Sequence, residues 1–96
     1  MRRKQTEHVG QVTHQVLREI GLESPYNEYR LLQAWPEVIG QPITRYTGEM
    51  NITNRVLYVK IKSPALRAEL SVGRNVLVQR LNQYVGAQVI ERIVFT

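Results

Sequence analysis

The 96-residue sequence contains no cysteine and no aspartate, and these absences remove whole classes of functional site. Without cysteine there is no disulfide framework and no thiolate zinc site. Without aspartate, the acid of a catalytic triad would have to be a glutamate. The sequence also lacks a glycine-rich phosphate loop of the Walker type, so it offers no nucleotide site. We therefore expect neither an enzyme nor a cofactor, and no small-molecule substrate.

Long apolar runs are missing as well. No stretch approaches the roughly 20 apolar residues that cross a bilayer, and no signal-peptide core follows the basic N-terminus. We expect a cytoplasmic protein that makes no contact with membranes. The length suits one domain with a modest core, so we assign residues 1–5 to a disordered basic tail and residues 6–96 to the domain.

The two histidines do not predict a metal site. His8 and His14 are six residues apart in an expected helix, which separates them by about 240° around its axis. Side chains on different faces of a helix cannot share a metal ion. Solvated histidines are the better interpretation, and we expect no metal.

Positive charge is concentrated in one half of the chain, although the formal net charge is only +5. Residues 5–54 carry three arginines against six glutamates, whereas residues 55–80 carry six basic side chains against Glu69 alone. Such polarity lets one basic face meet an anion while a more acidic face meets something else. Ordinary solubilising surface charge is the alternative.

The most informative stretch is a strand that runs into a helix. Residues 56–62 alternate, with Leu57, Val59 and Ile61 on one side and Tyr58, Lys60 and Lys62 on the other, which predicts a half-buried strand. Ser63 and Pro64 then supply an N-cap and a first helical residue. Apolar residues at helical spacing predict one long helix over residues 64–85, closed by Gly86.

The remaining elements follow from the same rules. A helix is expected over residues 7–20 with Thr6 as N-cap, and a second helix from Ser24 or Asn27 to Gly40 with a kink or fresh turn at Pro36. Residues 43–53 predict a strand with a bulge at Gly48, paired as an antiparallel hairpin with the next strand through a turn at residues 54–55. Residues 88–95 predict a last strand with Ile93 and Phe95 inward.

These elements give the order α-α-β-β-α-β, an α+β fold in which helices cover one face of a small antiparallel or mixed sheet. The other face would be open and would carry Tyr58, Lys60 and Lys62. Trp35 fits a core residue better than an interface anchor, because a lone tryptophan on an apolar helix face is usually buried.

The open face is the candidate nucleic-acid interface. Arg67, Ser71 and Arg74 would lie along one stripe of the long helix, which the strand lysines extend. Cations would bind phosphates, and Tyr58 would stack on an unpaired base. Alternatively, Tyr58 is an ordinary strand residue and the cations protect a sheet edge. The candidate binding residues are Arg2, Arg3, Lys4, Tyr58, Lys60, Lys62, Arg67 and Arg74.

A series of short motifs over residues 28–95 resembles the DciA family in order and spacing. The motifs are Trp35-Pro36-Glu37-Val38-Ile39-Gly40, Ile43, Val56-Leu57-Tyr58-Val59, Ser63-Pro64-Ala65-Leu66-Arg67-Ala68-Glu69-Leu70, Leu81-Asn82, Gly86, Val89, Ile93 and Phe95. The resemblance implies a KH-like fold and a part in bacterial DNA replication. It implies that the protein assists a hexameric DnaB-type replicative helicase onto single-stranded DNA, binds single- or double-stranded DNA itself, and has no ATPase activity.

The sequence departs from the family pattern in two places. Leu66 stands where members often have a second tryptophan, and the long tail of many members is missing, so the domain alone would have to engage helicase and DNA. The Gly-x-x-Gly clamp of nucleic-acid-binding KH domains is also absent, so contacts would run through side chains. Two alternatives remain: an RNA-associated KH-like module, and a purely protein-interaction domain.

Overall fold

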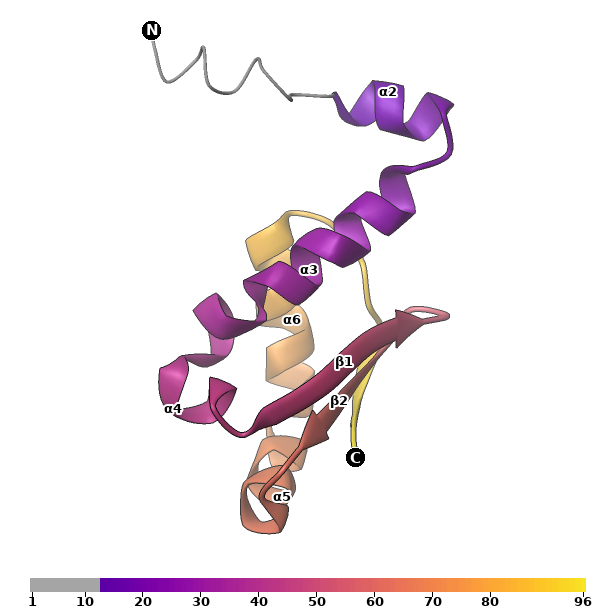
Figure 1. Cartoon of the computed structure of the whole chain (residues 1–96). Helices are drawn as coiled ribbons and strands as arrows, with labels where there is room; N and C mark the ends of the chain where they lie inside the picture. Colours follow the sequence, from indigo (N-terminus) through magenta and orange to yellow (C-terminus); the bar gives the residue numbers. More distant parts are fainter. Residues whose placement is uncertain (1–12) are drawn as a thin grey trace, which may run out of the picture.

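The structure, a computed structural model, describes residues 13–96 (Figure 1). The expected tail at residues 1–5, the expected N-cap Thr6 and residues 7–12 of the first expected helix lie outside the described residues. The elements, in chain order, are α2 (His14–Glu19), α3 (Glu23–Ile39), α4 (Gln41–Thr44), β1 (Thr47–Thr53), β2 (Val56–Ile61), α5 (Pro64–Val72), α6 (Arg74–Val85) and β3 (Arg92–Phe95).

The sheet has three strands in the order β1-β2-β3 and is mixed. Strands β1 and β2 pair antiparallel, and β3 pairs parallel to β2. The predicted hairpin is confirmed: Asn54 and Arg55 both have positive φ, 52° and 65°, as a tight two-residue turn of this hand requires. The register between the strands shifts between Thr47 and Met50, which confirms the bulge predicted at Gly48.

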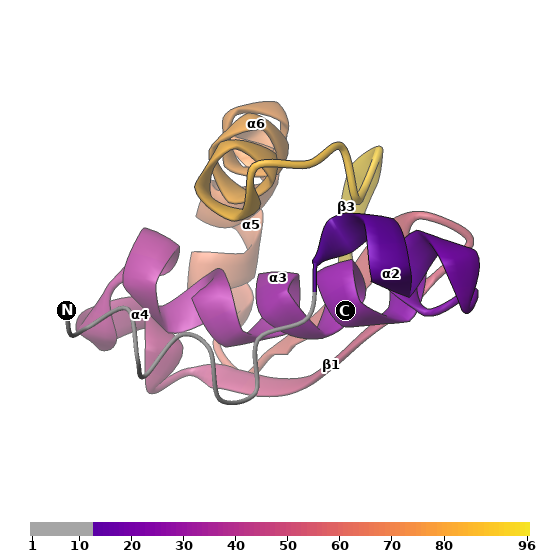
Figure 2. The same cartoon turned by 90° about the horizontal axis from the view of Figure 1, so that it is seen from above.

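The core lies between one face of this sheet and the helices. Leu57, Val59 and Ile61 are almost fully buried, as their alternation predicted. They join a cluster with Trp35 of α3 and Leu81 of α6. The view from above shows α6 and most of α3 on one side of the strands (Figure 2). The α+β class and the predicted element order are therefore confirmed, while the KH-like label stays a prediction.

Trp35 is a core residue, only 1% exposed. Its indole N–H donates a 3.1 Å hydrogen bond to Thr47 Oγ1, and that hydroxyl donates to the carbonyl of Ile43 at 3.2 Å. The polar tip of a buried tryptophan usually needs such a partner. The chain of bonds joins α3 to the start of β1.

The predicted helix over residues 64–85 is wrong in one respect: it is two helices that meet at Gly73. Gly73 has φ −98° and ψ 16°, outside helical geometry, and serves as the C-cap of α5 and the N-cap of α6. The leucine spacing continues across the break, so periodicity does not reveal it. The break lets α5 contact β2 and β3 while α6 packs against α3.

The ends of several other elements differ from prediction. The helix expected over residues 7–20 does not run through Thr13, because Thr13 has an extended backbone and caps α2 by accepting from the Val16 N–H. Ile43, expected in a strand, belongs to α4. The helix α3 continues through Pro36 to Ile39, and the carbonyl of Pro36 accepts from the Gly40 N–H, so no fresh turn begins at Pro36.

The last strand begins at Arg92 rather than at residue 88. Val89 and Ile90 are buried, but their backbone is bonded by the side chain of Asn82 instead of a neighbouring strand. Ile93 is buried as predicted, and Phe95 is partly buried against the core.

Candidate nucleic-acid interface

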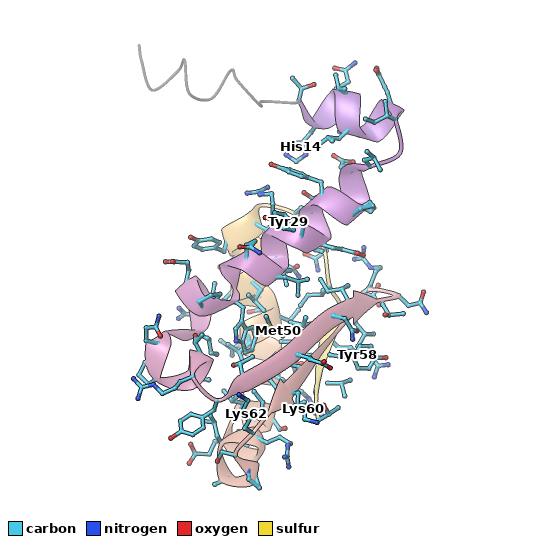
Figure 3. All side chains as sticks on the ribbon, in the orientation of Figure 1. His14, Tyr29, Met50, Tyr58, Lys60 and Lys62 are labelled. Atoms are coloured by element: carbon cyan, nitrogen blue, oxygen red, sulfur yellow. The ribbon has the colours of Figure 1, made fainter. Side chains whose placement is uncertain are left out.

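The outer face of the sheet carries a row of polar side chains along β2. Tyr58 and Lys60 point away from the core, and Lys62 follows directly after the strand (Figure 3). The N–H of Lys62 donates a 2.8 Å hydrogen bond to the carbonyl of Tyr46, so the strand pairing extends beyond the end of β2. The backbone therefore holds both lysines on a rigid scaffold.

The two lysines keep their charge available. Within residues 13–96, the salt bridges are His14–Glu23, Arg18–Glu23 and Arg55–Glu91, and neither Lys60 nor Lys62 takes part in one. Both lysines are exposed. An unpaired ammonium on an open face is free to meet a phosphate, mainly through long-range attraction.

Sequence reasoning missed one cation on this face, Arg92. The parallel register pairs Arg92 of β3 with Val56, and Val94 with Tyr58. Paired residues of neighbouring strands share a face, so exposed Arg92 lies on the same side as Tyr58 and Lys60. The sequence did contain a signal for Arg92. Neighbouring residues of a strand point to opposite faces, so the prediction that Ile93 points inward already required Arg92 to point outward.

Sequence reasoning also missed Tyr46. The register pairs Thr47 with Ile61, so Tyr46 is the residue opposite Lys62, and it is 47% exposed. It was assigned to no role because only the pairing of β1 with β2 brings it beside the lysines. Glu49 of β1 is exposed too, and next to inward Met50 it places one carboxylate on the outer side.

Arg67 and Arg74 are not joined in one stripe. The guanidinium of Arg67 donates from Nε to the Thr96 carbonyl at 3.2 Å and from Nη2 to the Ile61 carbonyl at 3.3 Å, so it ties α5 to the ends of two strands. Ser71 donates its hydroxyl to the Arg67 carbonyl. Arg74 is exposed and begins α6, beyond the break at Gly73, in the helical layer.

Arg2, Arg3 and Lys4 lie outside the described residues. In the described part of the chain no cluster of three or more potential ligands could hold a metal ion. No helix among residues 13–96 combines the length and apolarity needed to span a membrane.

A second surface stands out on the helices. Val72 at the end of α5 is 90% exposed, and Val76 of α6 is more than half exposed. Val76 lines a shallow hollow of about 460 Å³ together with Val38, Ile39 and Leu77, and the charged Glu69 and Arg80 also line it. We call Val72, Val76 and this hollow the helical apolar patch. Exposed apolar residues gathered in this way are typical of protein-binding surfaces.

Comparison with known proteins identifies one family. The family model described as "Dna[CI] antecedent, DciA" matches residues 8–95, nearly the whole chain. A comparison with curated proteins finds no match.

Proposed function

Because the chain belongs to the DciA family, whose role is related to loading the DnaB-type replicative helicase, we propose that it binds both this helicase and DNA. In this proposal it assists helicase loading without catalysing a reaction of its own. The family match over residues 8–95 carries the proposal. We assign the two surfaces described above to the two proposed partners, one to each.

The outer face of the sheet is the proposed DNA surface. Lys60, Lys62 and Arg92 present exposed cations on one side of the sheet, and Arg67 lies at its edge with two of its donors held by carbonyls. Contacts of this kind bind phosphate without reading sequence. Binding should therefore be weakly sequence-specific and should fall steeply with salt. Arg2, Arg3 and Lys4, which are not among the described residues, and Arg74 at the start of α6 remain proposed phosphate contacts.

The helical apolar patch is the proposed helicase surface. Val72 and Val76 leave apolar area in water that a protein partner would cover, and burying such area is the main favourable term in protein association. The patch belongs to α5, α6 and the end of α3, whereas the cations belong to the outer side of the sheet. One molecule could therefore hold helicase and DNA at once.

The test is capture of a purified DnaB-type helicase by this protein, with nuclease-treated partners, in the presence and absence of single-stranded DNA. We expect capture without DNA. Capture only with added DNA would mean that the two proteins merely share a strand, and would overturn direct helicase binding. No capture in either condition would overturn the helicase half of the proposal.

Two variants assign the surfaces in the same experiment. Val76→Glu places a charge in the helical apolar patch and should abolish capture, whereas Gln79→Glu adds the same charge to an exposed position of the same helix and should not. The double variant Lys60→Glu, Lys62→Glu should keep helicase capture and lose DNA binding. Loss of helicase capture in the lysine variant would contradict the division of the two surfaces.

A further inference from the structure

We propose that the outer face of the sheet distinguishes unpaired from paired DNA. In this proposal Tyr46 and Tyr58 stack on bases at the two ends of the row formed by Lys60 and Lys62, which we call the lysine row. This inference rests on the proposed DNA binding and adds the form of DNA and the residues that select it. It follows from the pairing of β1 with β2, which brings Tyr46 opposite Lys62, sixteen positions further along the sequence.

The order of side chains along the strand is the first argument. Tyr58, Lys60 and Lys62 follow one another at two-residue intervals on one side of β2, so Tyr58 and Lys62 are about 13 Å apart along the strand. Tyr46 lies opposite Lys62, linked to it by the 2.8 Å backbone hydrogen bond. An aromatic residue therefore stands at each end of a row of two cations, and the row is long enough for a short run of nucleotides.

The availability of the rings is the second argument. Tyr58 is 36% exposed and Tyr46 is 47% exposed. Among residues 13–96, the close contacts of an aromatic ring with another ring or with a cation both involve Tyr26, which meets His14 and Arg30. Neither Tyr46 nor Tyr58 makes a contact of either kind with a described residue. Neither hydroxyl makes a hydrogen bond to another described residue. Within residues 13–96, therefore, the exposed part of each tyrosine is not taken by an aromatic, cation or hydrogen-bond partner.

The third argument is the chemistry of the two DNA forms. Base faces of a duplex are already covered by stacking, so a tyrosine gains nothing from paired DNA unless the duplex opens. An unpaired base exposes its face, and its stacking on an aromatic ring tolerates any sequence. Lysines act on the phosphates of either form. The combination of free rings with free cations thus favours unpaired DNA, while cations alone would bind both forms.

The experiment compares the full chain with tyrosine and lysine variants, using fluorescence anisotropy on a labelled poly-dT oligonucleotide and a hairpin duplex of equal phosphate count at low salt. We expect Tyr46→Ala with Tyr58→Ala to weaken binding to poly-dT about tenfold or more, as the loss of two stacked bases implies. Binding to the duplex should change less than about twofold, because those contacts are to phosphate.

Controls separate stacking from folding. The double variant Tyr46→Phe, Tyr58→Phe keeps both rings and should retain poly-dT binding, which would show that the ring and not the hydroxyl is needed. Tyr29→Ala removes a tyrosine that is more exposed but lies on α3, away from the lysine row (Figure 3), and should leave binding unchanged. Thermal unfolding of each variant checks that the fold is retained.

The outcomes also separate this inference from the function on which it rests. Equal loss on poly-dT and duplex, or no loss on either, would overturn the stacking role while leaving DNA binding intact. Failure of the unaltered protein to bind either form would overturn both the inference and the DNA half of the proposed function. Tighter binding to an RNA of matched sequence would overturn the assignment to DNA.

Discussion

The side chain of Asn82 holds the backbone of Ile90, eight residues further along the chain, through a 2.9 Å hydrogen bond from Nδ2 to the carbonyl. Its Oδ1 accepts from the N–H groups of Val89 at 2.9 Å and Ile90 at 3.2 Å. Asn82 is itself buried in α6. One amide therefore satisfies three buried backbone groups and fixes the segment that leads into β3, where an unpaired group would be costly.

Asn82→Ala should destabilise the protein by about 3 kcal/mol, because it leaves buried backbone donors and an acceptor without partners. Urea unfolding measures the change. Gln83→Ala, at the exposed neighbouring position, is the control and should shift stability by less than about 0.5 kcal/mol. A similar small effect at both positions would show that water replaces the amide at no cost.

Thr47→Val should cost about 1–2 kcal/mol, because the buried indole N–H of Trp35 loses its acceptor while the side-chain shape is kept. Thermal unfolding followed by tryptophan fluorescence reports both stability and the surroundings of this lone tryptophan. Thr53→Val, at the exposed end of β1, provides the matched control. Equal melting temperatures for the two variants would contradict a structural role for the Trp35–Thr47 bond.

The glycines that end α5 and α6 should respond in opposite ways to substitution by alanine. Gly86 has φ +83°, so Gly86→Ala should cost about 1–2 kcal/mol from left-handed backbone strain. Gly73 has φ −98° and no atom within 4 Å of an added Cβ, so Gly73→Ala should be neutral or stabilise by up to about 1 kcal/mol. The melting temperatures of the two variants measure these effects. A large drop in melting temperature for Gly73→Ala would mean that the break between α5 and α6 needs glycine.

Neutralising Lys60 and Lys62 with glutamine should lower the slope of log affinity against log salt by about 1.4 for single-stranded DNA, if each lysine contacts one phosphate. Binding titrations at several salt concentrations measure this slope. Arg80→Gln, an exposed cation on α6, should leave the slope unchanged. If the lysine variant kept the slope of the unaltered protein, the outer face of the sheet would not be the phosphate-binding surface.

A pH-sensitive contact joins α2 to α3. The Arg18 guanidinium, which donates to Glu23 at 3.3 Å, holds the pKa of that carboxyl below its ordinary value, and His14 adds a smaller effect in the same direction. Because the pKa of Glu23 is lower in the folded state than in the unfolded state, ionised Glu23 contributes to the stability of the folded state, in full at pH values above its unfolded-state pKa. That contribution is lost as pH falls through the lowered pKa.

Carbon NMR titration of the Glu23 carboxyl should therefore show a pKa below the ordinary 4.5, and Arg18→Gln should raise it toward that value. The backbone signals of α2 should shift over the same pH range. An ordinary pKa for Glu23 in the unaltered protein would show that the contact does not persist in solution.

The local patterns of the sequence were sufficient for the hairpin and for the cap of α5, but not for the start of α3, which follows Leu22 rather than Ser24 or Asn27. Alternation in β2, the turn at Asn54 and Arg55, and the Ser63 cap are each decided by neighbouring residues, and all are present in the structure. The core face of β2 followed from the same alternation, since a period of two assigns every side chain to a face. The lysine row was predictable for this reason.

The sequence by itself determined the class of the fold, the order of its elements and the outward position of Tyr58, Lys60 and Lys62. Only the tertiary structure decided the break at Gly73, the segment held by Asn82, the place of Arg92 on the outer face of the sheet, and that of Tyr46 opposite Lys62. The physical reason is that these depend on contacts between residues far apart in the chain. Periodicity reports which side of an element is apolar, but not which other element will lie against it.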